Sequence, residues 1–143
     1  MKTLLLTVFI AVASMTMSAG DDAADTKALQ GTWLLVKAEL ATKPLPDDVV
    51  KSIMMTLSKN EYAVTAAGEP DDGTWSIDSS TVPKSMTVKG VKGPNAGRTF
   101  PCIYELNGDT LRICYDLSSA KRPTEFKTIA GTKLYLATYE RKK

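Results

Sequence analysis

Short segments in which apolar and polar residues alternate follow one another along the chain from residue 31 onward. Such alternation predicts β-strands, because successive side chains of a strand point to opposite faces of a sheet. The predicted strands lie at residues 31–40, 53–58, 61–66, 73–78, 85–89, 102–106, 109–115 and 133–141. Short strands at regular spacing are typical of sandwiches and barrels. We therefore expect an all-β fold, an eight-stranded antiparallel barrel, with at most one short helix.

The expected helix is a single turn that follows Pro46, where Asp47 and Asp48 would lie at its positive end. The strand at 31–40 carries apolar residues at Leu34 and Val36, while Trp33 falls on the other parity. This mismatch predicts either a twist or a β-bulge near the start of the strand, or a Trp33 that lies at the end of the barrel and not in its middle. The residues expected inside the barrel are Val36, Leu57, Val64, Trp75, Met86, Val88, Tyr104, Leu111, Ile113 and Leu136.

Residues 102–115 (CIYELNGDTLRICY) give the strongest local signal in the chain, because Asn107-Gly108 separates two alternating apolar runs. A two-residue turn at this position pairs Tyr104 with Leu111 and places Cys102 and Cys114 on opposite faces. Slipping the register by one residue would bring the two thiols together but would mix apolar and polar faces. An oxidising compartment favours a disulfide between them and the pattern disfavours it, so both alternatives stay open.

The first 20 residues have the pattern of a signal peptide that is removed on export. Lys2 supplies the positive charge, residues 4–13 the apolar run, and Ser18, Ala19 and Gly20 suit a cleavage site. The run is too short to span the ~30 Å hydrocarbon core of a membrane. We expect export to the periplasm or out of the cell, a flexible stub at 21–28, and one barrel domain at 29–143.

The chain contains no histidine, which excludes Ser-His-Asp and Cys-His catalysis and removes the commonest transition-metal ligand. Two cysteines cannot build a zinc site alone. A Ser-x-x-Lys match at 118–121 lies in a predicted loop and lacks the partner motifs of penicillin-binding enzymes. We therefore expect no enzymatic activity, no cofactor and no metal.

Charge gives little argument for a macromolecular partner, since 18 basic residues face 16 acidic ones. We expect no binding of nucleic acid, no membrane insertion of the mature chain, and a monomer.

Two arginines are expected to hold the structure together. Arg141 ends the last predicted strand, and Trp33 lies near the start of the first strand, two residues after Gly31. The two side chains can stack at the point where the first and last strands close the barrel. Arg122 can pair locally with Glu125 and pin the loop at 118–132, with Phe126 packed beneath it.

Several of these segments together resemble an uncharacterised lipocalin-like domain family found mainly in planctomycete bacteria, whose members are small exported proteins. The resemblance is carried by LQGTW at 29–33, GTW at 73–75 with Ile77-Asp78 and Pro83-Lys84, IYEL at 103–106, GDTL at 108–111, Cys114, Arg122-Pro123, Glu125-Phe126 and Arg141. It covers essentially the whole mature chain, and Cys102 departs from it. The resemblance implies export and a lipocalin-like eight-stranded barrel, and it carries over no catalytic residue.

Two functions remain open. The barrel could bind a small apolar or amphipathic ligand, for which the candidate residues are Met55, Leu57, Tyr62, Trp75, Met86 and Tyr104, with the mouth beside the strand at 53–58. The alternative is a filled barrel without a cavity that acts as a protein-interaction module through its loops at 43–46 and 122–126.

Overall fold

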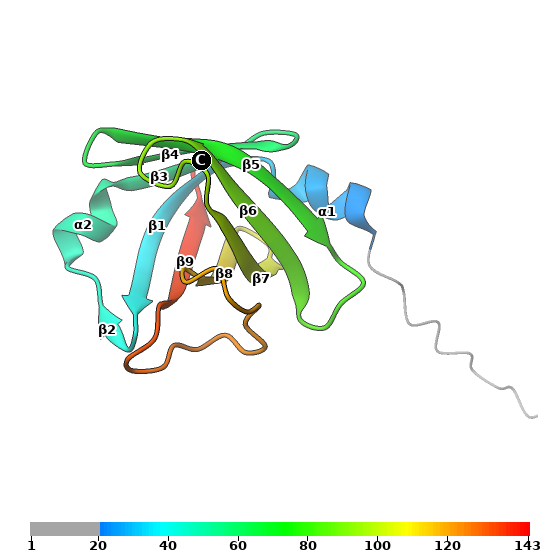
Figure 1. The fold of residues 1–143 in the computed structure, drawn as a ribbon. Helices are drawn as coiled ribbons and strands as arrows, with labels where there is room; N and C mark the ends of the chain where they lie inside the picture. Colours follow the sequence, from blue (N-terminus) through cyan, green and yellow to red (C-terminus); the bar gives the residue numbers. More distant parts are fainter. Residues whose placement is uncertain (1–20) are drawn as a thin grey trace, which may run out of the picture.

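The computed structural model describes residues 21–143, so the predicted signal peptide at residues 1–20 lies outside the described part. In chain order the described elements are α1 (Asp22–Leu29), β1 (Gly31–Leu40), β2 (Lys43–Pro44), α2 (Asp47–Ser52), β3 (Ile53–Leu57), β4 (Glu61–Ala66), β5 (Glu69–Asp78), β6 (Lys84–Lys92), β7 (Thr99–Asn107), β8 (Thr110–Asp116) and β9 (Leu134–Arg141). Helix α2 lies where the short turn after Pro46 was expected (Figure 1).

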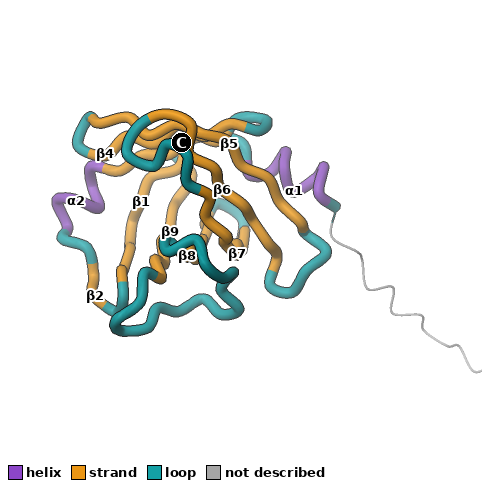
Figure 2. The backbone as a smooth tube through the Cα atoms, in the orientation of Figure 1, coloured by secondary structure: helices purple, strands orange, loops and turns teal. Residues whose placement is uncertain are grey.

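The strands form a closed antiparallel barrel, which confirms the predicted fold class. Neighbouring strands follow the chain from β3 to β9, and β1 pairs with both β3 and β9. Eight strands therefore close the barrel, and the two-residue β2 adds a short extra strand to the end of β1. Loops join the strands at both ends (Figure 2). We refer to the end where β1 begins and β9 ends as the closed end, and to the other as the open end.

A β-bulge in β1 decides which of its side chains face inward. Trp33 and Leu35 are buried, the pairing with β9 then shifts between Leu35 and Lys37, and Ala38 is buried after the shift. A bulge was one of the expected alternatives, but the prediction that Val36 lies inside is wrong. The bulge places Val36 on the opposite face from Ala38, although the two residues are two positions apart, and leaves Val36 44% exposed. Leu136 was also misplaced: it pairs with Cys114 on the outer face, whereas its neighbour Ala137 is buried.

The hairpin of β7 and β8 has the predicted faces with a different register. Gly108 and Asp109 form the turn, so Asn107 pairs with Thr110 and Tyr104 pairs with Ile113, not with Leu111. The shift is by two residues, which leaves every side chain on the same face.

The two cysteines are free thiols on opposite sides of the barrel wall. Cys102 belongs to the interior core, while the sulfur of Cys114 lies 3.7 Å from the carbonyl oxygen of Lys127 in the loop outside. Between the alternatives left open by the sequence, this arrangement favours the unbridged state, because Cβ vectors that point to opposite faces cannot be joined.

Helix α1 replaces the flexible stub that was expected at residues 21–28 and covers the closed end. Asp21 caps the helix by accepting from the backbone N–H groups of Ala23 and Ala24, and Leu29 is fully buried in the core. Asp25 accepts hydrogen bonds from the Lys84 ammonium at 2.8 Å and from the Tyr104 hydroxyl at 2.7 Å. The polar residues that suggested a mobile segment are therefore the groups that anchor it.

Arg141 and Trp33 pack against each other at the closed end, as expected from the sequence. The guanidinium carbon lies 4.3 Å from the centre of the indole ring, and the indole N–H donates to the carbonyl of Leu29 at 2.9 Å. The guanidinium donates to the carbonyls of Ala28 at 2.7 Å and Gln30 at 2.9 Å, so it also binds the end of α1. Gly31 makes this approach feasible, since a Cβ there would lie 2.8 Å from Nη1 of Arg141.

We predict that Arg141→Ala lowers the free energy of unfolding by about 1–3 kcal/mol, because one cation–π contact, two charge-assisted hydrogen bonds to carbonyls and the ion pair with Asp109 are lost together. Urea denaturation followed by circular dichroism measures the change. Arg112→Ala is the matched control: its guanidinium also stacks on a ring, that of Phe126, but its one other side-chain contact within residues 21–143 is an exposed pair with Glu105. Equal losses for the two variants would contradict the role assigned to Arg141.

The attachment of α1 predicts a specific loss of stability in acid. Burial opposes ionisation of Asp25, but the hydrogen bonds from Lys84 and Tyr104 outweigh it and hold the pKa of Asp25 below its usual value. A lowered folded-state pKa stabilises the protein above about pH 4 and loses that contribution as pH falls through the folded value. Asp25→Asn should therefore flatten the fall in unfolding free energy between about pH 5 and pH 2. Glu125→Gln, which removes an exposed carboxylate, should leave the slope unchanged.

Candidate functional site

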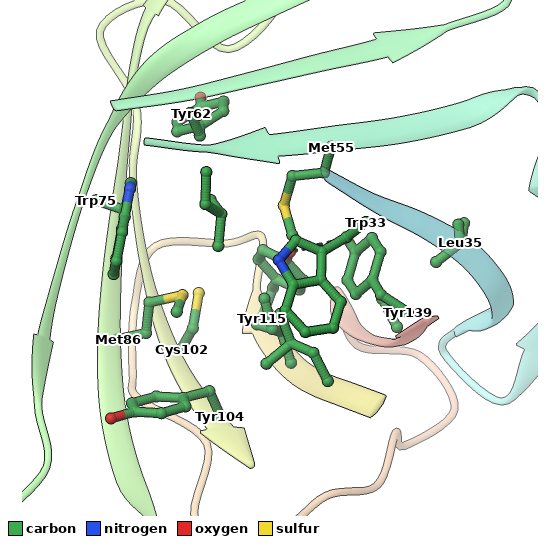
Figure 3. Close-up of a cluster of buried hydrophobic side chains, with 14 of the residues drawn as sticks. Trp33, Leu35, Met55, Tyr62, Trp75, Met86, Cys102, Tyr104, Tyr115 and Tyr139 are labelled. Atoms are coloured by element: carbon green, nitrogen blue, oxygen red, sulfur yellow. Dashed lines mark hydrogen bonds between the residues drawn. The ribbon is translucent and has the colours of Figure 1, made fainter. Parts of the chain in front are cut away.

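A cavity of about 230 Å³ lies inside the barrel and extends to its open end. Its walls are mainly apolar and aromatic and come from β3, β4, β5, β6, β8 and β9, together with the start of β7 and the loop before it. The lining residues are Ile53, Met55, Leu57, Tyr62, Val64, Asp71, Trp75, Met86, Val88, Asn95, Arg98, Phe100, Ile113, Tyr115, Leu117, Tyr135 and Tyr139. Figure 3 shows several of them gathered around the interior.

Most of the predicted ligand-binding residues meet in this cavity: Met55, Leu57, Tyr62, Trp75 and Met86 all line it. Tyr104 does not. Its ring is buried nearer the closed end, where its hydroxyl donates to Asp25, and in Figure 3 it lies at the opposite margin of the cluster from Tyr62. Ile53, at the start of β3, also lines the cavity, whereas the loop at 43–48, which was expected next to the mouth, contributes no lining residue.

Sequence reasoning missed three tyrosines of the cavity wall, Tyr115, Tyr135 and Tyr139. Tyr115 was on the predicted inner face of the hairpin and could have been included. Tyr135 and Tyr139 share the parity of Ala137 on β9, and placing Leu136 inside turned both of them outward in the prediction.

The polar atoms of the aromatic wall are uncharged. The hydroxyls of Tyr115 and Tyr139 lie 3.0 Å apart, and burial raises the pKa of both phenols. Burial, with a further contribution from Asp71 and Asp72, raises the pKa of Tyr62 to about 12. The indole N–H of Trp75 donates to the carbonyls of Ser58 and Glu61, each at 3.0 Å. The rings therefore present apolar faces to the cavity, and the phenols stay protonated at neutral pH.

The charged residues of the cavity lining, Asp71 and Arg98, lie at its rim, where Asn95 and Leu117 contact them. Asn95, in the loop at 93–98, donates to Oδ2 of Asp71 at 2.7 Å and ties that loop to the start of β5. Arg98 donates from Nη2 to the carbonyl of Leu117 at 3.1 Å, and its guanidinium carbon lies 5.3 Å from the ring centre of Phe100. The Gly-rich segment at 90–97, expected to be a simple surface loop, thus supplies part of the cavity mouth.

The loop at 117–133 is pinned by Arg122, but not through the ion pair expected with Glu125. Arg122 donates from Nη1 to the carbonyls of Met86 and Cys102, each at 2.6 Å, and from Nη2 to the hydroxyl of Thr87 at 3.0 Å. Glu125 instead pairs with Lys127 in solvent. The strand carbonyls are better partners for Arg122 because they lie in the wall that the loop covers. Phe126 packs under Arg112.

Comparison with known proteins gives no match for this chain: no family model, no curated protein and no solved structure is significantly similar to it. The resemblance to the lipocalin-like family therefore stays a prediction. Within residues 21–143, none of the helices has the length and apolar character needed to cross a bilayer. In the same part of the chain, no three His, Cys, Asp or Glu side chains gather as a metal ion would require.

We predict that Arg122→Met lowers the free energy of unfolding by about 2 kcal/mol, because two strand carbonyls lose a charged donor. It should also speed chymotrypsin cleavage after Phe126, since the loop is no longer held on the wall. Lys121→Met is the matched control, because the backbone N–H of Lys121, not its side chain, contacts Asp116. Equal cleavage rates in the two variants would show that the loop is held by other contacts.

Proposed function

We propose that this chain is an exported lipocalin-like carrier that binds one small, largely apolar molecule in the cavity at the open end of the barrel. The observation that carries the proposal is the cavity itself, because a barrel filled by side chains would leave no such space among its inward-facing residues. A concave, mainly apolar site with a few polar groups at its rim is the usual form of a small-molecule site.

The cavity volume limits the ligand to a size smaller than a long-chain fatty acid. An apolar cavity of about 150 Å³ accommodates benzene, so one of 230 Å³ has room for about nine non-hydrogen atoms. For so small a ligand, we expect a dissociation constant roughly between micromolar and millimolar.

The residues support binding and give no support to catalysis. Ser118 of the Ser-x-x-Lys match donates its hydroxyl to Asp116, a carboxylate that also caps the following turn, and Lys121 contacts the same group through its backbone. The tyrosines of the cavity have raised pKa values and lack a neighbouring base among the lining residues other than Asp71, which Asn95 engages.

The test is ligand-observed saturation-transfer NMR with benzyl alcohol, a small neutral aromatic probe, on the mature protein. We expect saturable binding that falls at least about tenfold in Met55→Trp, since the larger ring fills the cavity next to Trp33 and Tyr139. Leu34→Trp is the matched control, because the neighbouring Leu34 points outward from β1 and is 39% exposed. Native mass spectrometry of protein from the source cell would then identify the natural ligand.

Absence of saturable binding by benzyl alcohol and by a panel of other small apolar probes would overturn the proposal. An equal loss of binding in Met55→Trp and Leu34→Trp would do the same. In either case, a protein-interaction module that uses the barrel loops becomes the better interpretation.

A further inference from the structure

We infer that the ligand is a small aromatic monocarboxylate whose ring enters the cavity and whose carboxylate binds Arg98 at the mouth. This inference rests on the proposed function and adds the chemical class of the ligand to it.

The walls of the cavity favour a flat aromatic body over an alkyl chain. Six aromatic side chains line it: Tyr62, Trp75, Phe100, Tyr115, Tyr135 and Tyr139. Aromatic rings attract one another through edge-to-face and offset contacts beyond the effect of buried area. Met55 and Met86 add sulfur atoms, which also make favourable contacts with rings. A benzoate-sized molecule matches the roughly nine non-hydrogen atoms that the volume allows.

Arg98 is the cationic side chain of the cavity lining, and it has donors to spare. A guanidinium carries five N–H donors in a planar fork that fits a carboxylate. One of its nitrogens, Nη2, donates to Leu117, and within residues 21–143 no acidic side chain forms an ion pair with Arg98. The side chain is exposed, so an incoming anion can reach it without displacing a protein partner.

Asp71, the acidic side chain of the lining, is not available to a ligand in the same way. Its Oδ2 accepts from Asn95, and its Oδ1 is buried without a hydrogen-bond partner, next to the backbone at Gly93. A cationic ligand would therefore meet a carboxylate that is already engaged on one oxygen and covered on the other. The negative charge of Asp71 repels a dianion about twice as strongly as a monoanion, so of the anions that could bind Arg98 a monoanion is the better match.

The experiment compares benzoate with benzyl alcohol, which has a similar ring without the charge, by saturation-transfer NMR at low ionic strength. We expect benzoate to bind about tenfold more tightly than benzyl alcohol to the unmodified mature protein. Arg98→Gln should remove this advantage, so that benzoate binds no more tightly than benzyl alcohol, while Arg98→Lys should retain part of it. Lys92→Gln is the matched control. Lys92 ends β6, just before the loop that carries Arg98, so the variant removes a nearby positive charge without changing a residue of the cavity lining.

The outcomes separate this inference from the proposed function. Binding of benzyl alcohol without a preference for benzoate, or a preference that survives Arg98→Gln, overturns the inference and leaves the cavity as a neutral apolar site. Failure of both probes overturns the proposed function itself. Binding of benzyl alcohol to Arg98→Gln verifies that the variant is folded. If that variant does not fold, the unmodified protein decides the question. A preference for benzoate over benzyl alcohol that disappears at high salt supports the inference, because an exposed ion pair is screened, and a preference that persists contradicts it.

Discussion

The pairing of β1 with β9 closes the barrel, and the other features of the molecule depend on it. Without that ladder, both strands would be sheet edges, and the inner faces of β3 to β8 would curl around an open core. Arg141 reinforces the closure at one point by stacking on Trp33 of β1 and binding the last carbonyls of α1. One guanidinium of the last strand thus joins the helix and the first strand, which lie more than 100 residues earlier in the chain.

The two ends of the barrel are filled by different kinds of residues. Trp33 and Leu29 fill the closed end, and both are fully buried. At the open end, the barrel is lined by tyrosines whose hydroxyls must reach a polar partner or water. Tyr115 and Tyr139 meet this requirement through each other, with their hydroxyl oxygens 3.0 Å apart. The hollow is therefore a consequence of which residues can pack together at each end.

How far the sequence predicted this structure depends on the range of the interaction concerned. Alternation placed the faces of β7 and β8 correctly even though the register differed by two residues, because the burial of a face is insensitive to an even shift. It failed at Val36, where a bulge changes the parity within one strand, and at Leu136, an apolar residue that pairs with Cys114 on the outer face. Helix α1 was missed because its anchors, Lys84, Tyr104 and Arg141, lie far away in the sequence.

The candidate site was predictable on its apolar side and not on its polar side. Five of the predicted residues share one cavity, since inward-facing residues of a small barrel converge by geometry. No sequence pattern marked Arg98 as a cavity residue. It follows a Gly-rich loop, and only the folded position of that loop brings its side chain to the cavity. In the same way, Arg122 binds the carbonyls of Met86 and Cys102 and not its neighbour Glu125. No local sequence pattern relates Arg122 to these two strand residues.

The positions of the two ends of the described chain have a consequence for how the barrel presents its cavity. Asp21 begins α1 at the closed end, and β9 finishes there, where the N–H of Lys142 donates to the carbonyl of Thr32 at 2.8 Å. Anything attached to either end, whether a surface, a resin or a second protein, is therefore held at the pole opposite the mouth. Tethered from either end, the barrel keeps its cavity directed toward the surrounding solution.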